Sequence, residues 1–184
     1  MNICFTGHRP NKLGGYDWNT PKNKAIMDKL QKHIINIIVN SDDTTFRFIC
    51  GGALGIDQMA FSICQYLRGD QSKWDTPVKI KLVLAIPFEK QDCKWSQDSV
   101  NIFRQQRKNA DEVILVDTLE NYKFDAVKTG EYHPAKMQLR NMYMVDRADL
   151  VIAVWDGTNG GTGNCVKYAR KQNKQILIID PNKL

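Results

Sequence analysis

Short runs of apolar residues alternate along the chain with longer stretches in which apolar positions recur every three or four residues. Most of the short runs are almost unbroken, which is typical of strands buried on both faces of a parallel sheet. We therefore expect six strands, at Asn2–Phe5, Phe46–Cys50, Ile80–Ile86, Val113–Val116, Leu150–Trp155 and Gln175–Asp180.

The stretches between these runs predict helices. Thr20 is a suitable N-cap and Pro21 suits a first helical turn. From Ile26 to Ile38, apolar side chains then recur at helical spacing. A second helix is expected after Gly55, and three more at about residues 95–109, 135–148 and 163–172. This alternation predicts an α/β fold, with an open, mostly parallel sheet and helices on both faces.

Length and composition fit one domain spanning residues 1–184, with an ordinary charged fraction of 25%. No apolar run approaches the ~20 residues of a membrane span, and we expect neither a signal peptide nor a membrane partner. The five cysteines lack a CxxC pair and a regular spacing, which favours neither a disulfide framework nor a zinc site. We therefore expect a cytoplasmic protein with reduced cysteines and no metal.

The net charge of +6 raises the question of nucleic acid. The positive surplus is spread over several segments without a basic run, and lysines outnumber arginines. Sequence-specific nucleic-acid readers rely on arginine. We therefore expect a solvated, lysine-rich surface, and we keep nucleic acid as an alternative partner that is not favoured. A homo-oligomer is also left open.

Candidate functional residues cluster directly after four of the predicted strands. In an open α/β sheet, ligands bind outside the carboxyl ends of the strands, so these residues should face one crevice. They are Thr6, Gly7, His8 and Arg9 after the first strand; Gly51, Gly52, Ala53, Leu54, Gly55 and Asp57 after the second; Pro87 and Phe88 after the third; and Trp155, Asp156, Gly157, Gly160, Gly161, Thr162 and Asn164 after the fifth.

Two glycine-rich turns, at 51–57 and 160–163, each connect a buried strand to a helix. Glycines let a ligand approach the backbone closely, and the first N–H groups of a helix favour an anion such as phosphate. The first turn is neither a Walker A loop nor a GxGxxG motif. Tight packing of strand against helix is the alternative reason for either turn alone. The presence of two favours a phosphate-bearing ligand.

Several side chains near these turns suit such a ligand. Arg9 can pair with phosphate or bond carbonyls of its own domain, and His8 can act as a general acid or base or cap its loop. Arg140, with its neighbour Asn141, either faces the site or is solvated. Asp57 and Asp156 can each contact a sugar hydroxyl or stabilise the local backbone.

A long irregular stretch, Asp117–Pro134, is the other unusual feature of the chain. Loops of this length in compact domains are often functional or mobile. Tyr132 and His133 in this stretch can stack on a nucleobase, although an exposed aromatic residue in a loop often has no such role.

Together these residues carry a family resemblance. The segments FTGHRP, GGALGIDQMA, AIPF, MQLRNMYMVDRADLVIAVWDG and GGTGNCVKYA occur in this order, with Trp95 after the third. They resemble the YpsA-like branch of the SLOG superfamily, whose relatives include DprA/Smf DNA-processing proteins and LOG-type phosphoribohydrolases. The resemblance spans about residues 3–181 and implies a Rossmann-like fold with a site for a nucleotide-type ligand, but no certain cofactor.

The sequence departs from the LOG-type pattern, in which a PGGxGTxxE loop carries a glutamate that works on the N-glycosidic bond. Here the loop from Asn159 to Val166 reads NGGTGNCV, and no glutamate follows. Our first hypothesis is therefore a protein that binds a nucleotide-derived small molecule, such as an ADP-ribose-like signal. The alternatives are an N-glycosidic hydrolase, with Asp57, Asp156 and His8 as candidate catalytic groups, and a DprA-like binder of single-stranded DNA.

Overall fold

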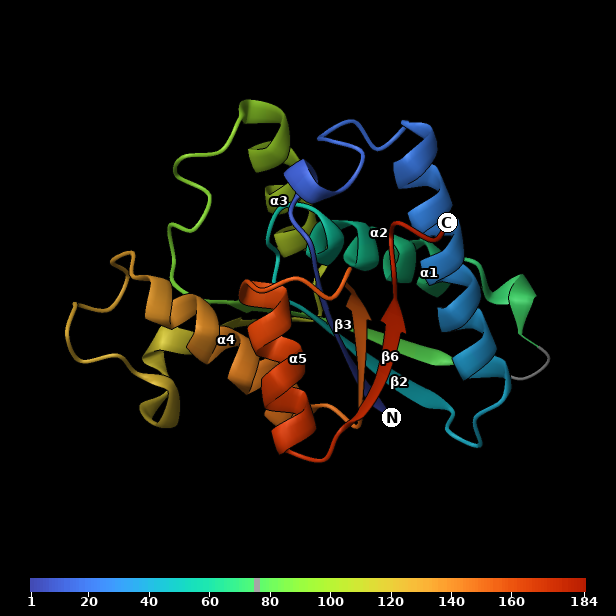
Figure 1. Ribbon diagram of the computed structural model, residues 1–184. Helices are drawn as coiled ribbons and strands as arrows, with labels where there is room; N and C mark the ends of the chain where they lie inside the picture. Colours follow the sequence, from blue (N-terminus) through green and yellow to red (C-terminus); the bar gives the residue numbers. More distant parts are fainter. Residues whose placement is uncertain (75–76) are drawn as a thin grey trace.

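A single six-stranded sheet forms the centre of the computed structural model, which describes residues 1–74 and 77–184 (Figure 1). All its strands are parallel, in the order β4-β3-β2-β1-β5-β6. This confirms the predicted open α/β sheet of Rossmann-like type. The strands are β1 (Asn2–Gly7), β2 (Thr45–Cys50), β3 (Lys79–Ile86), β4 (Glu112–Leu115), β5 (Leu150–Val154) and β6 (Gln175–Ile179).

The first strand is longer than the apolar run predicts. β1 continues through Thr6 to Gly7, because both residues pair in register with β5, Thr6 with Ala153 and Gly7 with Val154. Thr6 and Gly7 are therefore strand residues and not part of the loop that follows. β5 in turn ends at Val154, so Trp155 lies just beyond the strand.

Helices cover both faces of the sheet, with α1, α2 and α3 on one face and α4 and α5 on the other (Figure 1). Residue alternation along the strands divides the core accordingly: Phe5 packs in the α1–α3 layer, whereas its neighbour Cys4 packs in the α4–α5 layer. The helices are α1 (Pro21–Val39), α2 (Ile56–Gly69), α3 (Gln97–Asn109), α4 (Pro134–Arg147) and α5 (Gly161–Lys171).

Two helix starts differ from the sequence prediction. α3 begins at Gln97 and not at Trp95, because the Ser96 side chain caps it by accepting a hydrogen bond from the backbone N–H of Ser99. α5 begins at Gly161, two residues earlier than expected, with Gly160 as its N-cap. Part of the second glycine turn therefore forms the first turn of this helix.

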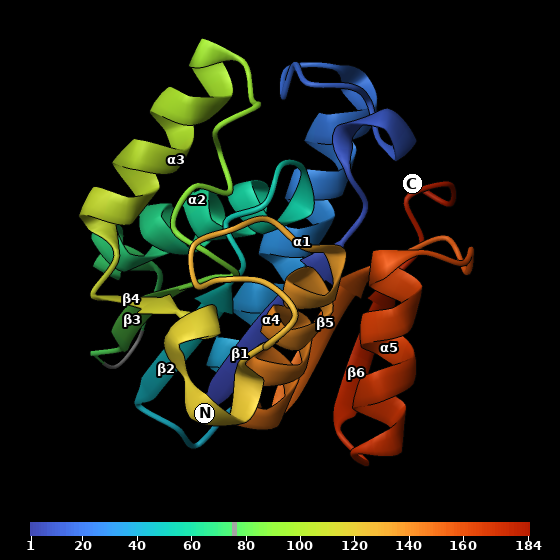
Figure 2. The same ribbon diagram turned by 90° about the vertical axis from the view of Figure 1, so that its left-hand side faces the viewer.

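The long stretch between β4 and α4 is more ordered than its composition predicts. It contains two short 3-10 helices, η3 (Val116–Thr118) and η4 (Glu120–Tyr122), and it lies along α4 (Figure 2). Across the described residues, no helix is both long enough and apolar enough to cross a membrane.

Candidate ligand site at the carboxyl edge of the sheet

A cavity of about 290 Å³ opens at the carboxyl edge of the sheet, where the strand order reverses at β1 and β5. Such reversal points are the usual ligand sites of open α/β sheets. The structure brings eleven of the predicted site residues into the cavity wall. They are Thr6, Gly7, His8, Arg9, Ala53, Asp57, Arg140, Asn141, Gly160, Gly161 and Thr162.

The other predicted site residues lie outside this wall. Phe88 lines a second cavity beside the first, and Trp155, Asp156 and Gly157 line a third. The residues that line neither the first cavity nor these two are Gly51, Gly52, Leu54, Gly55, Pro87 and Asn164.

Six residues of the wall were not named as ligand-binding candidates, although Gly163 belongs to the predicted glycine turn at 160–163: Asn11, Lys12, Met137, Thr158, Asn159 and Gly163. The sequence did contain a feature that could have identified one of these residues, Met137. Met137, Arg140 and Asn141 are spaced i, i+3 and i+4, so they share one face of α4. Lys12 comes from η1 (Pro10–Lys12), a 3-10 turn placed directly after β1, which no apolar periodicity marks.

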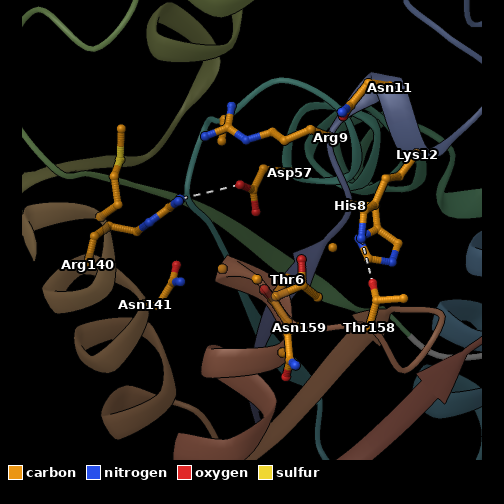
Figure 3. Close-up of a pocket in the computed structure, with 17 residues that line it drawn as sticks. Thr6, His8, Arg9, Asn11, Lys12, Asp57, Arg140, Asn141, Thr158 and Asn159 are labelled. Atoms are coloured by element: carbon orange, nitrogen blue, oxygen red, sulfur yellow. Dashed lines mark hydrogen bonds and ion pairs between the residues drawn. The ribbon is translucent and has the colours of Figure 1, made fainter. Parts of the chain in front are cut away.

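Arg140 and Asp57 form a buried ion pair inside the cavity. Arg140 Nη1 donates to Asp57 Oδ2 at 3.3 Å, and the two side chains are only 5% and 10% exposed (Figure 3). The Nε of Arg140 is buried and has no hydrogen-bond partner among the described residues. Arg140 is therefore not the solvated side chain that the sequence left as an alternative, and part of its donor capacity is unused.

Arg9 extends over Asp57 from the loop after β1, so that the side chains of Arg9, Asp57 and Arg140 converge from three elements (Figure 3). Although part of the Arg9 side chain is exposed, loss of solvent lowers the pKa of its guanidinium from the ordinary value. The neighbouring Arg140 lowers it further, whereas Asp57 acts in the opposite direction. Two guanidinium groups thus lie near one carboxylate, so positive charge exceeds negative charge at this point of the wall.

His8, on the opposite side of the cavity, is held by Asp156. Its Nε2 lies 2.6 Å from Asp156 Oδ1, close enough for a charge-assisted hydrogen bond. Asp156 Oδ1 also accepts from the hydroxyl of Thr158 at 2.6 Å and from its backbone N–H at 3.0 Å. These bonds, the hydroxyl of Thr158 first, hold the pKa of Asp156 well below its usual range. Asp156 therefore holds the His8 ring in position, but Asp156 itself does not line the cavity.

Lys12 also lines the cavity on the side of His8. Its Nζ donates to Thr158 Oγ1 at 2.5 Å, so η1 and the loop after β5 are joined across the cavity mouth (Figure 3). Among the ionisable side chains that line the cavity, Arg9, Lys12 and Arg140 are basic, Asp57 is acidic, and His8 is the remaining group. The wall therefore has a surplus of positive charge.

The two glycine turns have different roles. In the first turn, Gly52 and Gly55 have positive φ angles of 66° and 92°. A Cβ at Gly52 would lie 2.7 Å from the Phe103 ring, and one at Gly55 would lie 2.4 Å from the carbonyl oxygen of His8. The backbone N–H of Ile56, the first residue of α2, already donates to that same oxygen. This turn is packed against its own protein.

The second turn is packed at Gly163, where a Cβ would lie 2.9 Å from the carbonyl oxygen of Thr158, but it is open at Gly160 and Gly161. A Cβ at Gly161 would meet no heavy atom of the described chain within 4 Å. α5 begins here without a side-chain cap within the part of the chain that the structure describes. The first N–H groups of a helix lack partners within the helix, and they carry the positive end of its dipole. The N-terminus of α5 therefore presents backbone donors to the cavity.

No cluster of three or more His, Cys, Asp or Glu side chains suited to a metal ion occurs among the described residues. The cysteines are free, and Cys4, Cys50, Cys64 and Cys165 are buried. Burial raises the pKa of each of these thiols, to about 11 for Cys165, so they remain protonated near neutral pH.

Comparison with known protein families identifies the family of this chain. The model described as "YspA SLOG family" matches residues 3–184. The chain belongs to the YpsA family. This confirms the resemblance that the sequence motifs indicated. Relatives include the "Uncharacterized SPbeta prophage-derived protein YoqJ" of Bacillus subtilis (strain 168), 40% identical over 151 residues, 82% of this chain and 84% of that protein. A UPF0398 protein of Bacillus cereus is 22% identical over 174 residues, 95% of this chain and 84% of that protein.

Solved structures show the same fold as this member of the YpsA family. DNA processing protein A (DprA) from Streptococcus pneumoniae matches with a TM-score of 0.63 at 15% identity. DprA from Helicobacter pylori, whose description concerns its single-stranded DNA binding mode, matches with a TM-score of 0.56 at 15% identity. The chain spans 50% and 65% of those two proteins, respectively. At this level of identity the likeness concerns the fold.

Proposed function

We propose that this protein binds a nucleotide-derived small molecule, with a phosphate of the ligand at the N-terminus of α5. The observation that carries this proposal is that an uncapped helix N-terminus opens into a cavity whose wall has surplus positive charge. Backbone donors and basic side chains converging on one cavity form a suitable phosphate site.

The charges of the wall explain how the phosphate is retained. Arg140 and Arg9 approach the cavity from one side and Lys12 from the other (Figure 3). Asp57 neutralises one of these three positive charges. A phosphate at the N-terminus of α5 supplies a negative charge that balances the surplus positive charge of the wall.

The remaining polar wall suits a sugar. Asn11, Asn141 and Asn159 present amide groups, which both donate and accept, and Thr6 and Thr162 present hydroxyls. These uncharged groups match ribose hydroxyls, whereas a purely inorganic anion would leave most of them unused. An ADP-ribose-like molecule combines the two chemistries.

An N-glycosidic hydrolase is the second candidate, and the His8–Asp156 pair favours it. An imidazole that lines a cavity and is oriented by a carboxylate behind it is the arrangement of a general acid or base. Asp57 is less suited to this role, because Arg140 engages its carboxylate. Incubation with nucleoside monophosphates, followed by chromatographic detection of free base, tests this candidate.

Titration calorimetry with AMP, ADP-ribose and inorganic phosphate tests the binding proposal. Gly161→Val should abolish binding of all three, because the new side chain fills the space in front of the α5 N-terminus without touching the fold. Gly69→Val is the matched control, since a Cβ there also meets no described atom within 4 Å but lies far from the cavity. Unchanged affinity in Gly161→Val would exclude this phosphate site.

A DprA-like binder of single-stranded DNA is the remaining alternative, and it rests on the shared fold. It predicts that oligonucleotides bind more tightly than mononucleotides and that affinity falls steeply with salt, because several phosphates displace counterions. The same titrations repeated with a short single-stranded oligonucleotide at two salt concentrations separate it from the small-molecule proposal.

A further inference from the structure

We infer that the second cavity, next to the phosphate site, holds the nucleobase of the same ligand, so that the protein selects an intact nucleotide and not a sugar phosphate. This inference rests on the proposed function. The second cavity measures about 340 Å³ and adjoins the first, since Arg9 and Met137 line both. Its wall carries three aromatic rings, those of Phe88, Trp95 and Tyr132.

The aromatic rings are arranged to receive a flat ligand. Tyr132 meets Phe88 edge to face, with ring centres 5.8 Å apart and planes at 80°. The Phe88 ring is only 3% exposed and supports the Tyr132 ring, which is 64% exposed. Trp95 is supported in the same way by Phe103, at 5.5 Å and 70°. The exposed ring of Tyr132 and the half-buried ring of Trp95 thus each rest against a buried ring at the cavity, an arrangement suited to stacking on a base.

Tyr132 sits on the long loop before α4, and a buried ion pair anchors that loop. Lys136 Nζ lies 3.0 Å from Asp117 Oδ2 and donates to the carbonyl of Lys128 at 2.8 Å. The same Asp117 oxygen accepts from the backbone N–H of Gly130 at 2.7 Å. The two charged side chains are at most 2% exposed. The loop is therefore anchored at Gly130 and Lys136, on either side of Tyr132, and such anchoring limits the entropy lost on binding.

Gln91 supplies a polar group suited to a base edge. It lines the second cavity and is only 6% exposed, and its Oε1 has no hydrogen-bond partner among the described residues. Its Nε2 makes one long hydrogen bond of 3.5 Å to the carbonyl of Gly51. A buried carboxamide oxygen that accepts no hydrogen bond carries a desolvation cost. A base with an exocyclic amine, such as adenine, offers that oxygen a donor.

Basic side chains near the second cavity also suit a nucleotide. Lys90 and Lys94 are exposed at the second cavity, and Arg9 lies between the two cavities. Aromatic rings interleaved with basic groups bind a stacked base together with its phosphate. The same chemistry would accept the terminal base of a DNA strand, and the experiment below distinguishes this source from a free nucleotide.

Calorimetric affinities for AMP and ribose 5-phosphate, which differ by the base alone, test the inference. We expect AMP to bind at least tenfold more tightly than ribose 5-phosphate. Tyr132→Ala should weaken AMP roughly tenfold, as expected for the loss of one stacking ring, and leave ribose 5-phosphate within about twofold. Tyr66→Ala is the matched control, because Tyr66 is also exposed, at 54%, but lines neither cavity. Gln91→Leu should weaken AMP selectively as well.

Each outcome decides between named alternatives. Equal affinity for the two ligands, both abolished by Gly161→Val, would overturn the base subsite and leave the phosphate site intact. Binding of neither ligand would overturn the proposed function and the subsite with it. Tighter binding of a short single-stranded oligonucleotide than of AMP, lost in Tyr132→Ala, would assign the subsite to a DNA strand and overturn its assignment to a free nucleotide.

Discussion

The guanidinium of Arg140 occupies the space that a side chain at position 51 would need. A Cβ on Gly51 would lie 1.0 Å from Arg140 Nη1 and 2.2 Å from Cζ. Because Gly51 has no side chain, Arg140 of α4 has the space it needs to reach Asp57. This makes Gly51 a positioning residue for the site, although it does not line the cavity.

Gly51→Ala should displace Arg140 and weaken phosphate binding. The backbone at Gly51 is not left-handed, so the cost arises from the clash, roughly 1–3 kcal/mol of unfolding free energy as for other overpacked sites. Urea denaturation and phosphate titration measure both effects. In an Arg140→Ala background the added cost should largely vanish, because nothing remains to clash. Gly69→Ala is the control, and equal cost in both backgrounds would contradict the steric relationship.

Asp57→Asn should raise the affinity for inorganic phosphate. The substitution keeps the size of the side chain but removes the charge that competes with phosphate for Arg140. Neutralising one partner at this distance is expected to change the affinity for phosphate by about fivefold, or ~1 kcal/mol. Calorimetry with inorganic phosphate measures the change, with Asp149→Asn as a control outside the cavity.

The same variant separates binding from catalysis. A parent protein that releases free base from a nucleoside monophosphate should keep most of that turnover in Asp57→Asn if His8 is the acid or base. A fall of roughly a hundredfold or more, without loss of affinity, would place the catalytic role on Asp57 instead.

Lys136→Met should destabilise the protein strongly. The substitution leaves Asp117 as a buried, uncompensated charge, and breaking such pairs typically costs about 3–5 kcal/mol. Urea denaturation measures the loss, and Lys32→Met, on an exposed position of α1, should be close to neutral. A cost below 1 kcal/mol would show that the loop before α4 is not held by this pair. In that case Tyr132 would lose its anchor as well.

Asp156 should make the stability of the protein depend on pH in the acid range. Its pKa in the folded protein is lowered, so its contribution is fully present above the unfolded pKa of about 3.9 and is lost as pH falls toward the folded value. Asp156→Asn should therefore be less stable than the parent near neutral pH, and the difference should narrow below about pH 4. Denaturation curves from pH 3 to pH 7 measure this, with the exposed Asp42→Asn as the reference. A pH-independent difference would contradict the role of the carboxylate charge.

The sequence by itself determined the layers of this protein and the edge at which its candidate site lies. Near-continuous apolar runs mark buried parallel strands, and helical periodicity marks what covers them, because both patterns are local consequences of backbone geometry. Glycines after the second and fifth strands were recognisable for the same reason, since turns impose their requirements on neighbouring residues. Helix caps were harder to predict from the sequence: with Ser96 as its N-cap, α3 begins at Gln97, two residues after the predicted start.

Only the tertiary structure decided what those turns do. Both are glycine-rich, yet 51–55 is filled by Arg140, Phe103 and the backbone of His8, whereas Gly161 faces open space. The pairs that define the site join residues far apart in sequence, Arg140 with Asp57 across 83 positions and His8 with Asp156 across 148. Such pairings follow from the strand order and from side chains meeting across a shared edge. The local sequence pattern contains no information about strand order or about contacts across the sheet edge. Each partner residue fits its own strand, turn or helix whether or not the other is present.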